Sequence, residues 1–480
     1  MSTREMMCTN KTALSGFEAA SEEADPYRQC GPFERDFQKR QERQLKVFTE
    51  LERGLTIREV SAFRERVHFQ DSHRVPVQRW YPYREGYSIS LVNTFLEELN
   101  VTGVTFDPFA GTGTTLLASR MKDLQSFGVD VNPLSVLVCK VENEQYDQAD
   151  LQLFVRELDQ FKGLEISKKD FHTSFYLADK VFNRDILHAL LTFKHHIKTI
   201  ENEKIRNLLY VAWLSVIEDV SNIKKEGNGI KYKNRKRTPS GYIDIDKEIW
   251  ERKTFPDNKF DFVKNKILRR LEIILDDVKY SYGSSVRKPR VFNGDCLEFD
   301  RFFQDEIEFT FFSPPYCNCF DYFEIHKVEL WLGDFVTSQS NLRILRNQGF
   351  RSNTNALDRK TIRYRNGHVE NLISLFDTEN LWNKKIPNVV RGYFDDFHAL
   401  LLRLYRQTAR NGSVGIVVGN SAYSGIIIPT DILISEIARE VGFGIKSLSV
   451  ARHLTTSSQQ KKKLEKLNNY LRESIVLLQK

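Results

Sequence analysis

The feature that most constrains this chain is a short apolar strand that runs directly into a glycine-containing loop and a helix. Residues 104–106 form the apolar strand, residues 107–115 (DPFAGTGTT) form the loop, and residues 116–124 continue as a helical segment. A second apolar segment, residues 126–131, passes through Asp130 near its end. A strand, a tight loop, a helix and a second strand in this order predict the opening of a doubly wound α/β domain with a mixed, mostly parallel sheet.

The α/β pattern is interrupted twice. Helical sequence follows the first unit, strand-like segments return near residue 290, and a second polar stretch separates them from the last strands. Upstream, Ser88 is a candidate N-cap for an apolar-periodic helix. We expect a helical N-terminal extension at 1–70, a first core segment at 71–140, a helical insertion at 141–288, a second core segment at 289–333, a polar basic insertion at 334–392 and the end of the core at 393–480.

Composition excludes several classes. The chain has 480 residues, of which 41% are hydrophobic and 28% charged, as in soluble globular proteins. No apolar run approaches the roughly 20 residues that cross a bilayer, and the N-terminal segment lacks the apolar region of an export signal. The six cysteines are scattered, which favours a reducing cytoplasm. Cys317 and Cys319 are too close for the usual zinc spacing, so we expect no metal site.

The glycine loop has the chemistry of a ligand cradle. Gly111 and Gly113 let the backbone turn tightly and approach a ligand without a β-carbon in the way. Asp130, at the end of the next strand, is suited to accept hydrogen bonds from ribose hydroxyls. The loop reads GTGTT without the lysine of a P-loop, which argues against a nucleoside triphosphatase. An ordinary strand–helix turn, with Asp130 as an N-cap, remains the alternative at this point.

A second loop, Ser313-Pro314-Pro315-Tyr316, follows another apolar strand and therefore lies at the ligand-binding end of a parallel sheet. An exocyclic amine of a nucleobase is a poor nucleophile because its lone pair is delocalised into the ring. The Pro314 carbonyl, held by Pro315 in extended geometry, and the Ser313 hydroxyl are suited to accept hydrogen bonds from such an amine. Tyr316 offers a ring for stacking on a flipped base. The alternative is a Pro-Pro turn that ends the strand.

Taken together, these motifs resemble those of the amino-methyltransferase family of DNA modification enzymes. DPFAGTGTT is similar to the family's cofactor loop, SPPY to its catalytic motif, FGVDVNP to its ribose-binding motif and NGDCLEF to its adenine-binding motif. PYREGYS is similar to the segment that packs over the cofactor's methionine end. In this family a serine at the start of SPPY is typical of cytosine-N4 enzymes, whereas adenine-N6 enzymes usually carry Asp or Asn there.

The resemblance implies a Rossmann-like core that uses S-adenosylmethionine to methylate cytosine N4 in double-stranded DNA, after base flipping. It also implies a restriction–modification setting with a cognate restriction endonuclease, without direct contact between the two. Its catalytic motif falls on Ser313, Pro314, Pro315 and Tyr316. Its cofactor contacts fall on Asp107, Phe109, Gly111, Gly113, Thr114, Asp130 and Asp295.

Two departures from the family pattern leave the target base open. The large insertion lies between Asp130 and Asp295, and the cofactor loop precedes the catalytic loop, unlike in many cytosine-N4 enzymes. Adenine-N6 methylation of DNA and, further away, guanine-N2 methylation of RNA are therefore the rival reactions. A nucleic-acid-binding protein that keeps the fold without catalysis is the non-enzymatic rival.

Two basic stretches are candidates for DNA contact. The first, at residues 224–237, includes Tyr232 and the flexible Gly227 and Gly229, and is suited to follow phosphates. A solvated basic loop without a partner is its alternative. Its basic residues are Lys224, Lys225, Lys231, Lys233, Arg235, Lys236 and Arg237. The second stretch holds Arg343, Arg346, Arg351, Arg359, Lys360, Arg363 and Arg365. The sequence does not decide which of them reads base edges.

The segment after SPPY contains three further residues whose roles need to be assigned. Asp321 and Tyr322 are candidates for the wall of the base pocket. His326 lies within apolar helical spacing, which favours a structural histidine over a catalytic base. The reaction needs no strong base, because the amine loses its proton only after it becomes cationic, when water can accept it.

Overall fold

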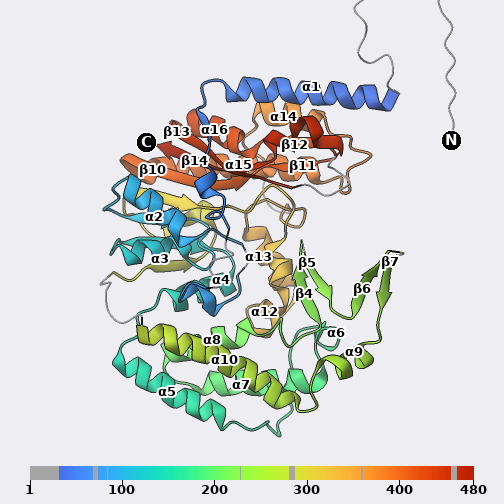
Figure 1. Ribbon diagram of the computed structural model, residues 1–480. Coiled ribbons are helices and arrows are strands. Elements are labelled where there is room, and N and C mark those ends of the chain that lie inside the picture. The colour runs from blue at the N-terminus through green and yellow to red at the C-terminus, as the bar shows by residue number, and fades with distance from the viewer. Residues whose placement is uncertain are drawn as a thin grey trace, which may run out of the picture.

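The computed structural model describes residues 32–68, 74–83, 85–227, 229–239, 241–280, 287–357, 361–455 and 462–480. Within these ranges the largest feature is an eight-stranded sheet (Figure 1). In spatial order its strands are β1 (Ile57–Glu59), β13 (Gly444–His453), β14 (Arg472–Gln479), β10 (Thr408–Gly419), β9 (Ile307–Phe312), β2 (Thr105–Asp107), β3 (Ser126–Asp130) and β8 (Arg290–Asn293).

The topology of this sheet reverses between β2 and β9. From β2 the chain adds β3 and then β8 on one side, and it later places β9 and β10 on the other side. These five strands are parallel, whereas β14 runs antiparallel between β10 and β13. Open α/β sheets bind ligands at the carboxyl ends of the strands where the order reverses. The mixed, mostly parallel sheet confirms the predicted α/β fold of the Rossmann-like methyltransferase type.

Helices cover both faces of the sheet, and strand alternation decides which residues meet them. On β14, Val476 and Leu478 pack with one core cluster, whereas Ile475 and Leu477 pack with another on the opposite face. The first face carries α1 (Pro32–Glu52), η4 (Cys296–Arg301), α14 (Gly367–Ser374), α15 (Ile386–Gln407) and α16 (Thr430–Val441). The second face carries α2 (Ile89–Glu98), α3 (Thr114–Met121) and α4 (Pro133–Glu142). Ser88 caps α2 as predicted, because its hydroxyl accepts a hydrogen bond from the Leu91 amide at 3.3 Å.

A second group of helices has its own core below the sheet in Figure 1. Its members are α5 (Gln148–Lys162), α6 (Ala178–Val181), α7 (Arg184–Thr199), α8 (Glu203–Ser215), α9 (Lys247–Thr254) and α10 (Lys259–Tyr280). Asp277 of α10 ties this group to the 3₁₀ turn η3 (Gln78–Trp80), because its carboxylate accepts from the Val77 amide, the Arg79 guanidinium and the Trp80 indole at 2.6–3.0 Å. That turn leads into the segment that lines the candidate site.

The basic stretch, which lies within the insertion expected to be helical, contributes to two β-hairpins. The first pairs β4 (Ile223–Glu226) with β5 (Gly229–Tyr232), and the second pairs β6 (Arg235–Thr238) with β7 (Gly241–Asp244). Short elements complete the described chain: η1 (Ser61–Phe63), α11 (Tyr322–Ile325), α12 (Lys327–Leu332), α13 (Gln339–Gln348), β11 (Ser421–Tyr423), β12 (Ile426–Ile428) and η5 (Lys462–Tyr470).

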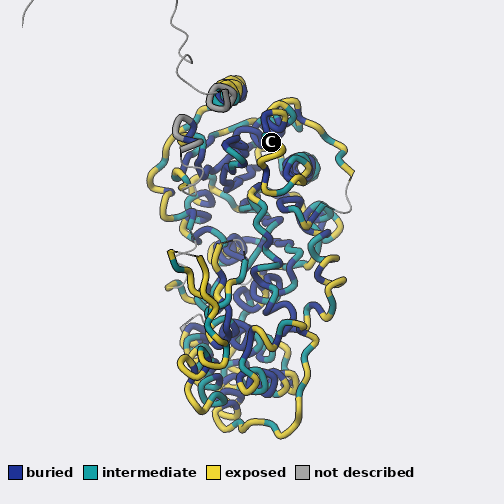
Figure 2. The backbone as a smooth tube through the Cα atoms, turned by 90° about the vertical axis from the view of Figure 1, so that its right-hand side faces the viewer, coloured by how far each residue is buried: buried dark blue, intermediate teal, exposed yellow. Residues whose placement is uncertain are grey.

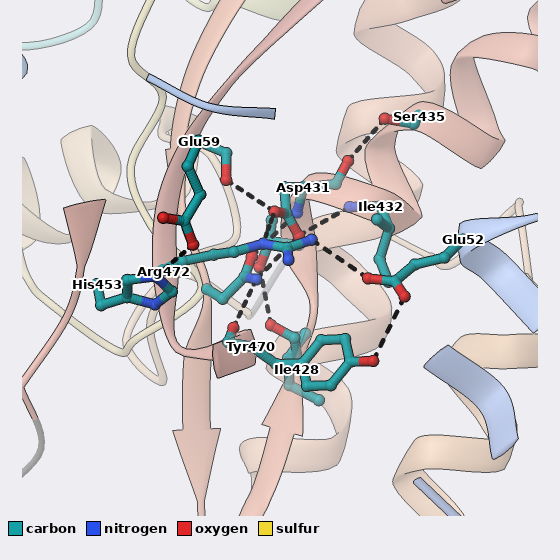
Figure 3. A network of polar contacts seen from close by, with 12 residues as sticks. Glu52, Glu59, Ile428, Asp431, Ile432, Ser435, His453, Tyr470 and Arg472 are labelled. Atoms are coloured by element: carbon teal, nitrogen blue, oxygen red, sulfur yellow. Dashed lines mark hydrogen bonds and ion pairs between the residues drawn. The ribbon is translucent and has the colours of Figure 1, made fainter. Parts of the chain in front are cut away.

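A buried polar network joins β14 to α16 (Figure 3). Asp431 is fully buried, and its carboxylate accepts from the Arg472 guanidinium at 2.7 Å and the Ser474 hydroxyl at 2.8 Å. The side-chain amide of Asn420 donates to the same carboxylate at 2.8 Å. Arg472 also lies 3.6 Å from the carboxylate of Glu52, at the end of α1. The network therefore connects the strand, the helix and the N-terminal helix in one place.

Two further findings concern the described ranges only. No helix there combines the length and the apolar character needed to cross a membrane. Cys139, Cys296, Cys317 and Cys319 form no disulfide, and no group of three or more His, Cys, Asp or Glu side chains is arranged to hold a metal ion there.

Candidate active site

The glycine loop and the SPPY loop emerge side by side. Strand β2 pairs in parallel with β9, with Thr105 opposite Phe309 and Phe106 opposite Thr310. Both strands end at the same edge of the sheet, and a cleft that is open to solvent lies there. Its walls include Phe109 and Gly111 from one loop and Ser313 and Pro315 from the other. The structure thus brings together two motifs that are about 200 residues apart in the sequence.

The glycine loop depends on close packing against α4. Gly113 has a φ of +91° and forms the N-cap of α3. A β-carbon at this position would lie against the Cys139 sulfur and 2.7 Å from the side-chain nitrogen of Asn143. Gly111 also has a positive φ, +50°, and its amide donates to Asp130 at 2.8 Å. At position 113, only glycine combines the positive φ with the absence of a β-carbon that would clash with α4. The sequence therefore specifies the shape of the loop.

Asp130 lies at the end of β3 and on the wall of the cleft. One carboxylate oxygen accepts from the Gly111 amide and the other from the Asn132 amide, each at 2.8 Å. Desolvation raises the pKa of Asp130 to about 6, and the two amide hydrogen bonds oppose this shift. The carboxylate keeps further lone pairs for hydroxyl donors from a ligand.

Asp107 and Phe109 have different places in the same loop. Asp107 is buried behind the cleft, where its carboxylate accepts from the Phe109 amide at 2.9 Å and the Tyr87 hydroxyl at 3.0 Å. Burial raises the pKa of Asp107 to about 7. Phe109 lies on the cleft wall and stacks on Phe312 with a centroid distance of 5.5 Å. Asp107 therefore shapes the loop, whereas Phe109 and Thr114 face the cleft.

Asp295 lies close to the cleft but its carboxylate caps a 3₁₀ helix. Its oxygen accepts from the Leu297 amide at 2.9 Å, and the next residue, Cys296, lines the cleft. The neighbouring Gly294 amide donates to the Asp130 carbonyl at 3.0 Å, which keeps the end of β8 beside the end of β3. A contact between Asp295 and a cofactor stays a prediction.

Within the SPPY loop, Ser313 and Pro315 line the cleft and Pro314 is buried. Tyr316 is oriented toward another part of the molecule. Its hydroxyl donates to the carboxylate of Glu473 on β14, and its ring lies against Gly419 at the end of β10. Burial raises the pKa of Tyr316 well above its usual value, so this hydroxyl stays protonated. Stacking of Tyr316 on a base stays a prediction, and its observed contacts fix the loop to the sheet.

The aromatic wall of the cleft comes largely from residues that sequence reasoning did not single out. Tyr83, Tyr87, Phe323 and Phe350 line it, together with the predicted Tyr322. Asp321 is buried beside it, where Arg346 lies 2.9 Å from its carboxylate. The PYREGYS motif was a signal for Tyr83 and Tyr87, but the pattern did not say that their rings face this cleft.

His326 is buried and does not line the cleft. Its ring stacks on Tyr83 with a centroid distance of 5.5 Å and an interplanar angle of 4°. The amine of Lys225 lies 3.5 Å from its Nδ1. These contacts give the histidine a structural place, as its spacing in the sequence favoured.

The polar insertion after SPPY contributes one wall of the cleft. Its wall residues are Arg346, Gln348, Gly349, Phe350, Ser352 and Asn353. Arg351, predicted as a DNA contact, is buried instead, with its guanidinium bonded to the carboxylates of Asp395 and Asp396. That prediction is wrong for Arg351, because its charge is already neutralised inside the protein. Arg359 and Lys360 lie outside the described residues.

Two lysines of the basic stretch are also engaged inside the protein. Lys225 is buried, and its amine forms an ion pair with Glu329 at 2.6 Å. The amine of Lys233 donates to the carbonyls of Glu218 at 2.6 Å and Ser221 at 2.9 Å. The prediction that Lys225 contacts DNA is corrected, because this side chain is buried in an ion pair, whereas Lys233 is half-buried and its contact with DNA stays a prediction. The remaining basic residues of the stretch, Lys224, Lys231, Arg235, Lys236 and Arg237, are exposed.

Comparison with known proteins gives relatives over most of the chain. M.AvaI of Nostoc sp. is 25% identical over 416 residues, which cover 81% of this chain and 84% of the relative. M.BsoBI of Geobacillus stearothermophilus is 26% identical over 461 residues, covering 87% and 88%. M.MvaI of Kocuria varians is 24% identical over 359 residues, covering 70% and 74%. All three are named type II methyltransferases, and no family model matches the chain.

Proposed function

We propose that this chain, which is similar to type II methyltransferases over most of its length, transfers a methyl group from S-adenosylmethionine to cytosine N4 in duplex DNA. The similarity and the fold support a DNA methyltransferase of a restriction–modification system. Cytosine N4 is the finer part of the proposal and rests on the serine that begins SPPY. The observation that carries the proposal is the parallel pairing of β2 with β9, which places both loops at one cleft.

The residues at the cleft fit the proposed cofactor. Gly111 lies on the cleft wall, and Gly113, packed closely against α4, shapes the loop at the start of α3, where the amide groups favour a carboxylate. The carboxylate of Asp130 suits the ribose hydroxyls, and the ring of Phe109 offers an apolar surface. When bound, S-adenosylmethionine supplies an electrophilic methyl group on its sulfonium. We propose that Thr114 and Asp295 complete its binding, with Asp107 supporting the loop from behind.

The chain's own contribution to catalysis is orientation and charge complementarity. The Ser313 hydroxyl and the Pro314 carbonyl accept hydrogen bonds from the target amine, which favours pyramidal nitrogen and frees its lone pair. Pro315 restricts the backbone of Pro314, so this carbonyl does not have to be ordered during the reaction. As positive charge develops on the amine, both acceptors stabilise it. Water accepts the proton afterwards, so the buried His326 is not required as a base.

We propose that the target base is flipped out of the duplex and enters the cleft beside the SPPY loop. We propose that the ring of Tyr322, on the cleft wall, stacks on this base in place of Tyr316, because the Tyr316 hydroxyl is bonded to Glu473. The exposed lysines and arginines of the hairpins supply contacts to the phosphates.

The test is the identity of the methylated nucleoside. DNA from cells that express the chain is digested to nucleosides and analysed by mass spectrometry, beside DNA from cells that express the Ser313→Ala variant. We expect N4-methylcytosine in the first sample and a strongly reduced amount in the second. N6-methyladenine in the first sample would show that the target base is adenine and that the chain is still a DNA methyltransferase. The absence of any methylated nucleoside would contradict the proposed function.

The pH dependence of cofactor affinity tests the assignment of Asp130. Its pKa is raised to about 6, and ribose hydroxyls donate to the ionised carboxylate, so ligand binding favours loss of the proton. Affinity is therefore lost as the pH falls through 6, and we expect S-adenosylmethionine to bind about tenfold more weakly at pH 5 than at pH 7. Calorimetric titrations measure this difference. The Asp130→Asn variant should bind weakly at both pH values, and an unchanged pH profile in this variant would assign the titration to another group.

A further inference from the structure

The second hairpin, β6–β7, projects from the molecule without a core of its own. Seven of its eight strand residues are exposed, and Thr238 is half-buried. Its strands stand apart from the main sheet in Figure 1, and the same side of the molecule shows exposed segments in Figure 2. Two large apolar side chains on β7, Tyr242 and Ile243, are 54% and 56% exposed. An isolated two-stranded hairpin is only marginally stable in water, so this one needs support at its base.

The base of the hairpin is held by a dense set of hydrogen bonds. Asn222 and Asn234 bond each other twice at 3.0 Å, through the amide of Asn222 and the backbone amide of Asn234. The Asn234 side chain donates to the Ile245 carbonyl at 2.8 Å, and the Lys233 amine holds two further carbonyls. The hairpin is therefore held by hydrogen bonds at its root, where Lys233, Asn234 and Ile245 lie, whereas the strand residues farther from this root are exposed.

The root is also connected to the wall of the active site. Lys225, on the neighbouring strand β4, forms its buried ion pair with Glu329 of α12 and lies beside His326. His326 in turn stacks on Tyr83, which lines the cleft. Because these contacts are buried and close, the position of the hairpins relative to the cleft is set by the fold.

The strand register places the side chains of β6–β7 on two faces. Arg235 pairs with Asp244, Lys236 with Ile243, and Arg237 with Tyr242. Side chains alternate along each strand, so one face carries Arg235, Arg237, Tyr242 and Asp244, and the other carries Lys236 and Ile243. The guanidinium of Arg235 lies over the Tyr242 ring at 4.7 Å and 3.3 Å from Asp244. Lys236 and Arg237, nearer the tip, form no ion pair with a described residue.

We propose that the β6–β7 hairpin enters the major groove of duplex DNA and reads base edges there, an inference that rests on the proposed DNA methyltransferase function. The major groove admits a two-stranded β-ribbon, and its guanine edges accept hydrogen bonds from Arg and Lys. The strands of the hairpin carry three basic side chains and one acidic side chain, and this excess of positive charge complements the phosphates that line the groove. The exposed Tyr242, which lies on the same face as Arg237, suits the methyl group of thymine, whereas Lys236 and Ile243 lie on the opposite face. The rigid root sets the distance between the bases that are read and the base that reacts.

The test compares two double variants that remove the same charges. Lys236→Ala/Arg237→Ala alters the hairpin, and Arg43→Ala/Lys46→Ala alters exposed residues of α1, on the far side of the sheet from the hairpins in Figure 1. Sequencing of modified DNA from expressing cells first supplies the target sequence. The affinities of the full-length chain and of both variants are then measured for a duplex with this sequence and for a scrambled duplex.

We expect the hairpin variant to lose about 10- to 100-fold in affinity for the target duplex and much less for the scrambled duplex, so that the preference falls. The control variant should keep the preference of the parent chain. Affinity for S-adenosylmethionine and the thermal unfolding midpoint should be unchanged in both, because the hairpin tip has no buried core.

An unchanged preference in the hairpin variant, or an equal loss in both variants, overturns the inference and leaves the hairpin as a phosphate contact or as a surface for another protein. Failure of the proposed function has a different signature. In that case the parent chain itself neither methylates DNA nor distinguishes the two duplexes.

Discussion

Replacing Ser313 with alanine is expected to lower kcat by about 10²- to 10³-fold, the usual cost of removing one positioned group that stabilises charge in the transition state. The Ser313 hydroxyl lies on the cleft wall, where it is proposed to accept a hydrogen bond from the target amine. The glycine loop and Asp130, which are proposed to hold the cofactor, come from other strands. The substitution should therefore leave cofactor affinity nearly unchanged.

Single-turnover methylation and calorimetric titration with S-adenosylmethionine separate these two effects. Ser313→Asn keeps a side-chain oxygen and should retain more activity than Ser313→Ala. Ser374→Ala, on the exposed face of α14, is a serine control that should behave as the parent chain. If Ser313→Ala lost cofactor binding to the same degree as turnover, the role assigned to this serine would be wrong.

Replacing Asp431 with alanine is expected to destabilise the fold by about 3–5 kcal/mol, because it leaves the charge of Arg472 buried without its main partner. The lost carboxylate accepts from Arg472, Ser474 and Asn420, all within 2.8 Å. The side chain of Arg472 is only 7% exposed, so water replaces little of this interaction.

Urea unfolding of the parent chain and the variant measures this loss. Asp159→Ala, which breaks an exposed pair with Lys162, is the control and should cost less than about 1 kcal/mol. A loss of similar size in the two variants would show that the Asp431 network contributes little to stability.

The parts of the fold that were predictable are those encoded locally. The strand before the glycine loop and the strand before SPPY are short apolar runs, and each motif marks where its strand ends. The rule that ligands bind at the carboxyl ends of parallel strands then predicted that both loops face one cleft. The pairing of Thr105 with Phe309 agrees with this expectation.

The residues that were not predictable depend on partners far along the chain. Lys224 and Lys225 are adjacent and identical in type, yet strand alternation exposes the first and buries the second. Burial of Lys225 is tolerated because Glu329 of α12 meets it, and nothing near Lys225 in the sequence announces this pair. In the same way, Tyr316 turns from the cleft because Glu473 and Gly419 reach it from the last part of the sheet.

Strand β14 has a consequence for the order in which the molecule assembles. It lies between β10 and β13 but follows both in the sequence, so the hydrogen-bonding edges of these two strands stay open until β14 is inserted. Its first residues, Arg472 and Glu473, supply the partners of Asp431 and Tyr316. A nascent chain that already contains the glycine loop and the SPPY loop thus still lacks Glu473, the residue that holds Tyr316 of the SPPY loop in place. Competence for methyl transfer would arrive late, together with closure of the sheet.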